Sequence, residues 1–408
     1  MSKEISGGVC AAKGFRAAGV HAGVKTHAEW KKDVTLIVSD RDCAAAAMFT
    51  KNVVKAAPVR VNMRHVADGK VRAVIANSGN ANACAPEGEE NALRMCAAAA
   101  QAVGCAPEDV MVCSTGVIGQ RLNVEAIEGA VPALYEALER SPAASDAAAH
   151  AIMTTDTVKK ECAVEGIIGG QTVRVGGIAK GSGMIHPNMG TMLCFLTTDC
   201  AISREMLNEA LHEVVRTTFN RISVDGDTST NDTCLILASG LAGNPEITEL
   251  DERYVDFVLL LHQVCYTLAR AMAKDGEGAK HLITCTVSGA RTEEQAENLS
   301  KSVISSTLTK AAIFGSDANW GRVLCAMGYS GESFDPDKVD ISFASDAGDI
   351  LVCEQGRGLV FDEDLAKKIL TEDEVDIDIT LAEGDESCTC WGCDITYDYI
   401  KINGDYRT

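Results

Sequence analysis

Positive charge is scarce in this chain of 408 residues: 37 lysine and arginine side chains stand against 58 aspartates and glutamates, a formal net charge of −21. Recognition of nucleic-acid phosphates needs a basic surface, so this balance argues against a nucleic-acid-binding protein. It also argues against docking on anionic lipid. A small anionic substrate would need a local positive site within a generally negative field.

Segments that would direct the chain to or through a membrane are lacking as well. The first residues, Met1 to Glu4, run directly into glycine-rich sequence without the apolar core of a secretory signal. The longest charge-free apolar helix candidate, Phe257 to Ala269, is shorter than the ~20 residues of a membrane span. Internal repeats and low-complexity linkers are not evident. We therefore expect a cytoplasmic protein with two or three packing units.

Cysteine, in contrast, is frequent, with 17 residues. Disulfide-stapled secreted domains are far shorter, so we expect reduced, mostly buried cysteines that pack as small apolar side chains. Cys390 and Cys393 form a C-x-x-C pair beside Cys388, but a second pair at the spacing of a zinc site is missing. We expect this cluster to pack along a strand and not to hold a metal.

Three stretches have the apolar periodicity of helices. Residues 91–104 end at a glycine, and residues 205–217 follow Ser203, a plausible N-cap. Residues 252–274 are apolar around most of the helix circumference, which predicts a helix that lies between layers.

Short β-rich runs alternate with these helices along the chain. They cover 34–38, 71–75, 194–198, 234–237, 282–287, 375–381 and 394–399. The last two alternate cleanly between apolar and polar residues, which is typical of sheets with one solvated face and favours antiparallel or mixed pairing. The predicted class is mixed α/β, with layered sheets flanked by helices.

The densest glycine and polar sequence is the loop Lys180-Gly-Ser-Gly-Met-Ile-His-Pro-Asn-Met-Gly-Thr191, which leads into an apolar strand. A phosphate-binding loop would need a second glycine at the Rossmann spacing or a Gly-Lys-Ser/Thr ending, and a helix after it; these are missing. A tight loop that feeds a strand fits the glycines equally well. A third interpretation is chemical, because a small residue followed by threonine at the start of a buried strand suits an N-terminal nucleophile.

In this chemical interpretation, the Thr191 hydroxyl attacks the carbonyl carbon of Gly190, the peptide becomes an ester by an N-to-O shift, and water cleaves the ester. The freed Thr191 then carries a hydroxyl and an α-amine on one residue. An α-amine has a pKa near ~8, so a useful fraction is unprotonated at neutral pH and can act as a base. A lysine side chain, with a pKa of ~10.4, would first need a large downward shift.

Further segments resemble the ornithine acetyltransferase family of arginine biosynthesis. They are Gly7–Gly19, Phe49–Asn52, Asn77–Cys84, Thr115–Gly119, Met153–Thr157, the Lys180–Thr191 loop, Phe219–Asp232, Asp275–Gly278, Gly315–Gly321 and Tyr397–Thr408. These segments follow one another in family order from residue 7 to residue 408, so the resemblance covers the whole chain.

The resemblance implies a self-cleaving acyltransferase of the N-terminal-nucleophile type, cut between Gly190 and Thr191. The two products would be an α chain of residues 1–190 and a β chain of residues 191–408, assembled as a heterotetramer of two α and two β chains. In the family, the acetyl group of N2-acetyl-L-ornithine passes to L-glutamate through an acetyl-threonine, implied here at Thr191, and some members also accept acetyl-CoA. No cofactor is expected. Gly190 departs from the alanine expected in the family; both are small, so cleavage is expected to survive.

The resemblance also implies roles for individual residues. Thr115 and Gly116 would form the oxyanion hole through the threonine hydroxyl and a backbone N–H. The implied substrate contacts are Thr154, Lys180, Thr191, Glu277, Asn403 and Thr408. Lys180 would supply a positive charge for a substrate α-carboxylate, and Glu277 would accept hydrogen bonds from a substrate ammonium group. From the sequence alone, Lys180 could equally be a solvated charge.

Other features have simpler interpretations. Residues 225–232 begin like a calcium loop, but its sixth residue is Thr230 instead of glycine and its twelfth is Ile236 instead of glutamate. A polar turn ordered by Asx-type hydrogen bonds is expected there. His186 could serve as a catalytic base, but an α-amine makes it unnecessary. Ser182 lacks the Gly-x-Ser-x-Gly context of a nucleophile elbow.

Two other function classes stay open. A self-cleaving N-terminal-nucleophile aminopeptidase or amidohydrolase would share the nucleophile but deliver the acyl group to water. A charged acceptor site made by Lys180 and Glu277 favours the transferase. The remaining class is a non-catalytic binding module, in which Gly190-Thr191 is only a turn.

Overall fold

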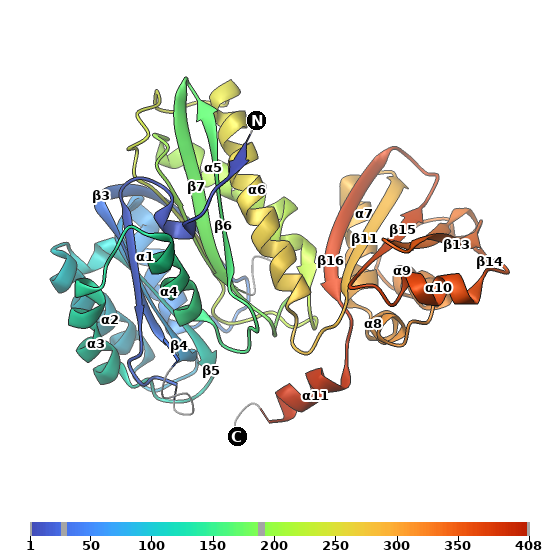
Figure 1. Cartoon of the computed structure of the whole chain (residues 1–408), viewed down its shortest axis with the longest axis horizontal. Helices are drawn as coiled ribbons and strands as arrows, with labels where there is room; N and C mark the ends of the chain where they lie inside the picture. The colour runs from blue at the N-terminus through green and yellow to red at the C-terminus, as the bar shows by residue number, and fades with distance from the viewer. Residues whose placement is uncertain (1, 26–30, 187–191, 406–408) are drawn as a thin grey trace. The chain divides into compact units, whose positions relative to one another are not determined.

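A computed structural model describes residues 2–25, 31–186 and 192–405 (Figure 1). The chain divides into two compact units. Unit 1 comprises residues 1–181, 187–220 and 228–272, and unit 2 comprises residues 182–186, 221–227 and 273–408. This division into folded units does not test the predicted cut after residue 190, which stays a prediction.

Unit 1 is built on a sheet to which nine strands of the described chain contribute, in the order β1-β6-β7-β8-β10-β3-β4-β5 with β2 paired to β3. The strands are β1 (Lys3–Glu4), β2 (Phe15–Val20), β3 (Val34–Phe49), β4 (Lys70–Asn80), β5 (Val110–Val117), β6 (Lys160–Ile168), β7 (Gln171–Lys180), β8 (Leu193–Thr198) and β10 (Thr233–Ala238). The pairs β4–β5 and β8–β10 are parallel and the others antiparallel. The prediction of mixed pairing is therefore confirmed.

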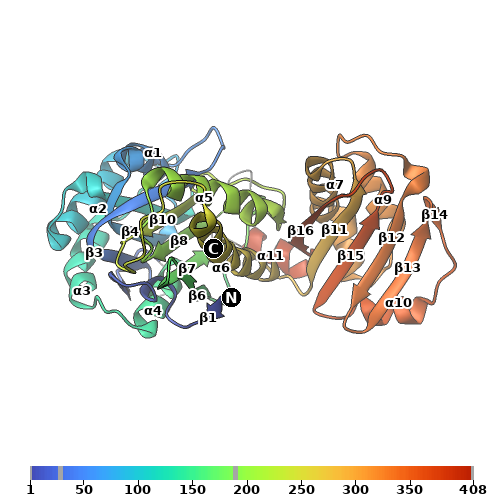
Figure 2. The same ribbon diagram turned by 90° about the horizontal axis from the view of Figure 1, so that it is seen from above.

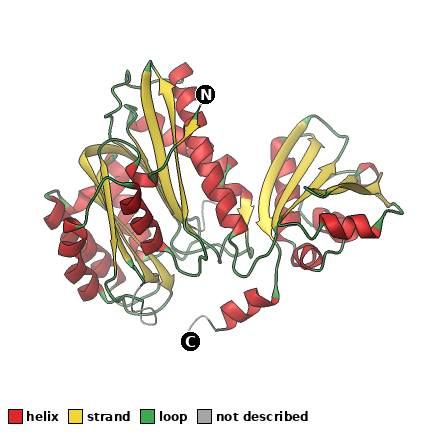
Figure 3. Ribbon diagram, viewed as in Figure 1, coloured by secondary structure: helices red, strands yellow, loops and turns green. Residues whose placement is uncertain are grey.

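Helices cover both faces of this sheet (Figure 3). They are α1 (Ala57–His65), α2 (Gly88–Val103), α3 (Val124–Glu136), α4 (Pro142–Ile152), α5 (Arg204–Thr217) and α6 (Glu252–Lys274), with 3-10 turns η1 (Gly8–Cys10), η2 (Val66–Asp68), η3 (Pro107–Asp109) and η4 (Phe219–Arg221). Successive strand residues point to opposite faces. Ile37 and Val74 accordingly pack with α4, while Leu36 and Ile75 pack with α2 and α3. Ser203 caps α5, as predicted, and accepts a hydrogen bond from the Met206 N–H.

Helix α6 has the predicted bounds but not the predicted surroundings. It packs beside β6 and β7, where Gly166 and Gly177 leave room for Leu260 and Leu268 (Figure 1). Its opposite face is exposed at Val255 and neighbouring apolar residues, so the expectation of a helix between two layers is wrong. By length and composition alone α6 could cross a membrane, with a mean hydropathy of 1.2. Its buried face packs on a sheet, as core helices of globular domains do.

Unit 2 is built on a second mixed sheet, whose strand order in the described chain is β14-β13-β12-β15-β11-β16-β9 (Figure 2). Its strands are β9 (Ile222–Ser223), β11 (Leu282–Ala290), β12 (Asp340–Ser345), β13 (Gly348–Glu354), β14 (Arg357–Gly358), β15 (Glu374–Thr380) and β16 (Glu386–Cys393). Its helices are α7 (Glu293–Ser305), α8 (Thr307–Phe314), α9 (Trp320–Gly328), α10 (Glu363–Ile369) and α11 (Tyr397–Gly404), with the 3-10 turn η5 (Pro336–Lys338). One core joins α7–α10 to one face of the sheet. The alternation predicted at 375–381 is confirmed, since Ile377 faces this core and Asp378 does not.

The run at 394–399 is a correction, because it is a helix start and not a strand. Asp394 turns back to accept hydrogen bonds from the backbone N–H groups of Lys280 and His281. Thr396 then caps α11, its hydroxyl accepting the N–H of Asp398. The apolar–polar alternation continues through these residues, but the strand ends because the Asp394 carboxylate and the capping Thr396 hydroxyl bind backbone N–H groups.

All seventeen cysteines are free thiols, and fourteen of them are buried, as predicted. Cys388, Cys390 and Cys393 lie on β16, in agreement with the predicted strand. The Ser300 hydroxyl donates to the Cys390 sulfur over 3.0 Å. Within the described ranges, no three histidine, cysteine, aspartate or glutamate side chains are grouped to hold a metal ion.

Candidate active site

The predicted oxyanion-hole residues lie where two parallel strands end. β4 and β5 pair in parallel, so their carboxyl ends meet at one edge of the sheet, with Gly79 opposite Gly116. Gly116 has a φ of +133°, and a Cβ there would lie 2.3 Å from the Gly79 carbonyl carbon. Only glycine fits this approach of two backbones. The strand end thus fixes the backbone at Gly116 next to the Thr115 side chain.

Lys180, the last residue of β7, reaches Thr115. Its ammonium Nζ donates to the Thr115 hydroxyl oxygen over 3.4 Å, and the lysine is only 8% exposed. Because the ammonium occupies a lone pair of that oxygen, the hydroxyl hydrogen can still be donated to a developing negative charge. Lys180 is therefore a buried charge in contact with a predicted catalytic group, and not a solvated one.

Thr154 is tied to the Lys180 end of β7 by a carboxylate. Asp156 accepts the Thr154 N–H over 3.0 Å on one oxygen and the Gly181 N–H over 2.8 Å on the other. The second oxygen also accepts from the Lys160 ammonium over 2.6 Å, and both of those side chains are fully buried. One carboxylate thus holds two predicted substrate-contacting segments of unit 1 together.

Replacing Asp156 by Asn is expected to destabilise the fold strongly, since it removes the buried carboxylate that pairs with the Lys160 ammonium. Removing one partner of such a buried pair typically costs about 3–5 kcal/mol of unfolding free energy. Urea denaturation at neutral pH measures the change. Asp146→Asn is the matched control: its ion pair with Lys159 is half-exposed and should be worth no more than about 1 kcal/mol. Equal losses in the two variants would contradict the role given to Asp156.

The same carboxylate predicts an acid-sensitive fold. Burial by itself would raise the pKa of the Asp156 carboxyl, but the positive charges of Lys180 and Lys160 outweigh it and lower the pKa to about 2. A carboxyl whose pKa is depressed by folding stabilises the protein above its unfolded pKa, 3.8 here. We expect this contribution, roughly 2 kcal/mol, to be lost as the pH falls from about 4 to about 2. The free energy of unfolding, measured as a function of pH, should show this loss in the wild type and lack it in Asp156→Asn.

Two further predicted substrate contacts meet in unit 2. Glu277 lies in the turn after α6 and is 6% exposed, with Gly183 against its carboxylate. The Asn403 amide nitrogen on α11 donates to Glu277 Oε2 over 2.7 Å. The start of α11 is fixed to the same turn, since the Thr396 hydroxyl donates to the Gly278 carbonyl over 2.7 Å. The pair Glu277–Asn403 is thus built on one local frame.

The structure therefore brings together the unit 1 residues Thr115, Gly116, Thr154 and Lys180, and separately Glu277 with Asn403 in unit 2. Gly190, Thr191 and Thr408 lie outside the described residues, so the predictions made for them stay predictions.

Ser182 and His186 were the alternative candidates for a nucleophile and a base in the Lys180–Thr191 loop, and each contacts a residue that explains its position. The Ser182 hydroxyl is buried and donates to the Asp275 carbonyl over 2.5 Å. His186 Nδ1 lies 3.1 Å from the Ser223 hydroxyl, and burial lowers the pKa of its imidazole. The predicted Asx-type turn is present, because Asp225 accepts the N–H of Asp227 over 3.2 Å.

Sequence reasoning missed Asp156 and Lys25. Asp156 lies in Met153–Thr157, a segment that resembles the family. The sequence of a polar turn does not indicate that its carboxylate is buried. Lys25 packs its side chain against Gly79, which pairs with Gly116 at the end of β5. Burial lowers the pKa of the Lys25 ammonium to about 8, with Lys31 and Lys180 lowering it further and Asp33 and Asp156 opposing. The sequence around Lys25, a single lysine before a polar stretch, does not indicate this burial or the lowered pKa.

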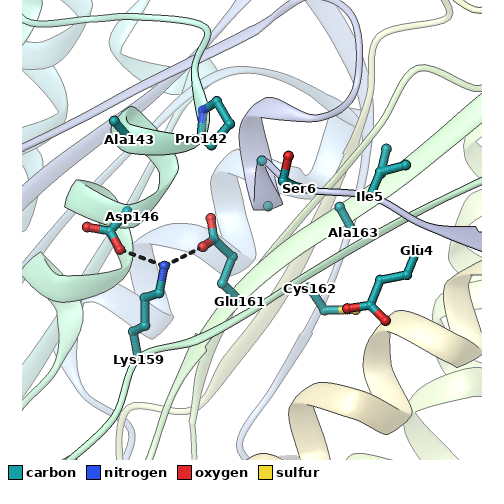
Figure 4. A pocket seen from close by; sticks show the side chains of 12 residues that line it. Glu4, Ile5, Ser6, Pro142, Ala143, Asp146, Lys159, Glu161, Cys162 and Ala163 are labelled. Carbon is teal, nitrogen blue, oxygen red and sulfur yellow. Dashed lines mark hydrogen bonds and ion pairs between the residues drawn. The ribbon is translucent and has the colours of Figure 1, made fainter.

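A surface pocket of about 500 Å³ lies elsewhere in unit 1 and includes none of the predicted site residues. The N-terminal segment, α4 and β6 line it (Figure 4). Its cation, Lys159, is already paired with Asp146 at 2.6 Å and Glu161 at 2.9 Å. Lys159 is thus already held by two carboxylates, and Glu4 adds further negative charge to the lining, so the pocket does not favour an anionic substrate.

Comparison with known proteins agrees with the motif resemblance. The ArgJ family model matches residues 16–408. The arginine biosynthesis bifunctional protein ArgJ of Symbiobacterium thermophilum is 50% identical over 99% of both chains. ArgJ 1 of Clostridium acetobutylicum is 48% identical over 97% of this chain and 96% of its own. A crystal structure of ArgJ from Bacillus halodurans, 42% identical, covers 52% of this chain and 98% of its own with a TM-score of 0.50. Matched over nearly its full length at this identity, the chain belongs to the ArgJ family.

Proposed function

We propose that this chain is an acetyltransferase of L-arginine biosynthesis that moves the acetyl group of N2-acetyl-L-ornithine to L-glutamate. The products are L-ornithine and N-acetyl-L-glutamate. The observation that carries the proposal is the family match over residues 16–408, which includes both groups of site residues and the Lys180–Thr191 loop. The relatives' names place them in arginine biosynthesis and call them bifunctional.

The chain first cuts itself. Thr191 Oγ attacks the carbonyl carbon of Gly190, the Gly190–Thr191 C–N bond breaks, and the hydroxyl proton passes to the released amine. Water then hydrolyses the ester, which leaves a Gly190 carboxylate and a free Thr191 hydroxyl. The crystal chain from Bacillus halodurans supports this step: 98% of it matches only 52% of our chain. A cut after residue 190 leaves a second piece of 408 − 190 = 218 residues, which is 53% of the chain.

Transfer then proceeds in two half-reactions through acetyl-Thr191. The Thr191 α-amine takes the hydroxyl proton as Oγ attacks the acetyl carbonyl, and ornithine leaves with that proton. The glutamate amine then attacks the acetyl ester, and the threonine hydroxyl is restored. In both steps the Thr115 hydroxyl and the Gly116 N–H donate to the oxyanion. This order gives ping-pong kinetics.

Local charge explains how an acidic protein binds these substrates. Donor and acceptor each carry an α-carboxylate, and the buried ammonium of Lys180 offers a positive charge at the predicted site. Glu277 Oε2 already accepts from Asn403, and the remaining oxygen can accept from a substrate ammonium. Each of these two groups thus matches one of the two charges of a zwitterionic amino acid.

Lys180→Met is expected to raise KM for glutamate about 10- to 100-fold, the loss typical of a charge-assisted hydrogen bond. Steady-state kinetics at saturating N-acetylornithine measure it. Lys159→Met is the matched control, because this lysine of unit 1 lies on the pocket of Figure 4 and should leave KM unchanged. Equal KM values in the wild type and Lys180→Met would contradict the assignment of Lys180.

The acceptor distinguishes the transferase from the hydrolase. Incubation with N-acetylornithine, with and without glutamate, is the test. A transferase forms N-acetylglutamate and releases little acetate, whereas acetate release that is unaffected by glutamate would favour an aminopeptidase-like amidohydrolase. A parallel assay with acetyl-CoA and glutamate decides whether acetyl-CoA is a second donor.

The family resemblance supports three further proposals about the mature protein. The α chain (residues 1–190) and β chain (residues 191–408) assemble as a heterotetramer of two copies each, the protein works in the cytoplasm, and it uses no cofactor. Native mass measurement beside denaturing mass measurement tests the assembly: the native mass should equal two α plus two β chains.

A further inference from the structure

The buried carboxylate of Asp33 fixes the backbone of the segment that carries Lys25. Its Oδ1 accepts the Ala22 N–H over 2.6 Å, and its Oδ2 accepts the Val24 N–H over 2.8 Å and the Lys25 N–H over 3.1 Å. The Asp33 side chain itself is fully buried. Because three backbone donors share one carboxylate, the fold determines where the backbone of Lys25 lies.

The Lys25 side chain packs next to the predicted oxyanion hole, which is formed by Thr115 and Gly116. A Cβ at Gly79 would lie 2.9 Å from Lys25 Cγ, and a Cβ at Gly116 would lie 2.3 Å from the Gly79 carbonyl carbon. Lys25, Gly79 and Gly116 therefore pack on one another in that order, and all of them belong to unit 1. Two glycines in succession let the lysine approach the backbone of the oxyanion hole closely.

The Lys25 ammonium shares its surroundings with charges of the same site. Burial is the main cause that lowers its pKa to about 8; Lys180 also lowers the pKa, and Asp156 raises it. The other charged neighbours are Asp33 and Lys31. Lys180 is the cation that contacts the Thr115 hydroxyl at 3.4 Å. The two ammonium groups repel each other, so a negative charge that forms near both relieves that repulsion.

We propose that Lys25 is a second cation of this site, and that its charge stabilises the negative oxygen held by Thr115 and Gly116 in each acetyl-transfer step. The inference rests on the proposed function, since it needs an oxyanion at that position. Lys25 acts through its charge and takes no part in the bond changes, which are those given above for Thr191 and the substrates. A fixed cation in a site with little water favours a developing negative charge without reorganisation.

The charge of Lys25 gives its contribution a dependence on pH. Lys25 acts while it is protonated, so its contribution is present below a pH of about 8 and is lost as the pH rises through that value. The Asp156 carboxyl, with a pKa of about 2, stays ionised in this range. The Thr191 α-amine also titrates near ~8, but it does so in the wild type and in every Lys25 variant. The ratio of two rates at one pH therefore isolates Lys25.

Single-turnover acetylation of cut protein by saturating N-acetylornithine, followed as a function of pH, tests the proposal. Lys25→Met should be about tenfold slower than the wild type at a pH of about 7, the order expected for one unit charge that acts without contact. The difference should vanish above a pH of about 9, where the wild-type Lys25 is itself neutral.

Two variants serve as controls. Arginine stays protonated throughout this range, so the rate of Lys25→Arg relative to the wild type should increase as the pH rises above about 8. Lys32→Met should match the wild type at every pH. The Lys32 carbonyl accepts the Lys25 Nζ over 3.1 Å, whereas its own Nζ donates to the Gly19 carbonyl over 3.0 Å.

The outcomes separate a role in charge stabilisation from other roles. A merely structural defect would slow Lys25→Met by the same factor at every pH, and that result overturns the proposal. A wild-type rate in Lys25→Met also overturns it, as does weaker binding of N-acetylornithine with an unchanged maximal rate.

If Lys25→Met does not fold or is not cut, Lys25→Arg provides the test, and a ratio to the wild type that stays constant with pH overturns the proposal. Thermal unfolding and denaturing mass measurement identify that case. Wild-type protein that forms no N-acetylglutamate overturns the proposed function itself, and this inference with it. Normal transfer by the wild type with unaltered Lys25 variants overturns the role of Lys25 alone.

Discussion

Thr191→Ala is expected to leave the chain as one uncut polypeptide and to abolish acetyl transfer. The variant loses the hydroxyl that attacks the Gly190 carbonyl, so no new chain start appears and no acetyl ester can form. Both losses should be complete to the detection limit, because the remaining groups bind substrate and stabilise the oxyanion but supply no nucleophile. Denaturing mass measurement reports the cleavage, and formation of N-acetylglutamate reports the transfer.

Thr191→Ser provides the control for this result. Serine keeps the hydroxyl and, once freed, the α-amine, so cleavage and transfer should both persist at reduced rates. Full transfer activity in Thr191→Ala would end the proposed mechanism, since another residue would have to be the nucleophile.

Thr115→Val should lower kcat by about 10²–10³-fold while the chain still folds, since valine matches threonine in shape. The hydroxyl is lost as an oxyanion donor, and the Lys180 ammonium loses the oxygen that it contacts at 3.4 Å. Removal of one oxyanion-hole donor typically costs about 2.7–4 kcal/mol of transition-state stabilisation. Single-turnover acetylation by N-acetylornithine isolates the chemical step.

A control variant and a possible contrary outcome test the prediction for Thr115→Val. Thr115→Ser keeps the hydroxyl and should retain most of the rate. A change in KM alone, with kcat intact, would place Thr115 in substrate binding and contradict its role as an oxyanion donor. Cleavage of Thr115→Val can be followed in the same samples, so a failure to mature is not mistaken for slow transfer.

The fold was largely predictable where one periodicity applied to a whole element. Residues 205–217 have one apolar helix face after a capping serine, and α5 follows them. Residues 394–399 alternate like a strand, but buried acceptors and the Thr396 cap make them a loop and a helix start. The local pattern could not indicate this, because the partners of Asp394 are more than a hundred residues away in the chain.

The residues of the candidate site likewise include some that the sequence could predict and some that it could not. Thr115, Lys180 and Glu277 were predictable because they stand in motifs that resemble a family over the whole chain. Asp156 and Lys25 were not, because their importance comes from burial and from neighbours brought close by folding. Gly116 lies between these cases: its motif was recognised, but the reason for glycine, its approach to Gly79, belongs to the strand pairing.

The most direct test of the central claim is the mass of the two chains after active protein has been incubated with N-acetylornithine in the absence of glutamate and then denatured. We predict two pieces, residues 1–190 and 191–408, with one acetyl group that peptide mapping assigns to the side chain of Thr191 and that glutamate removes. Active protein that stays a single chain, or an acetyl group carried by any other residue, would contradict the account.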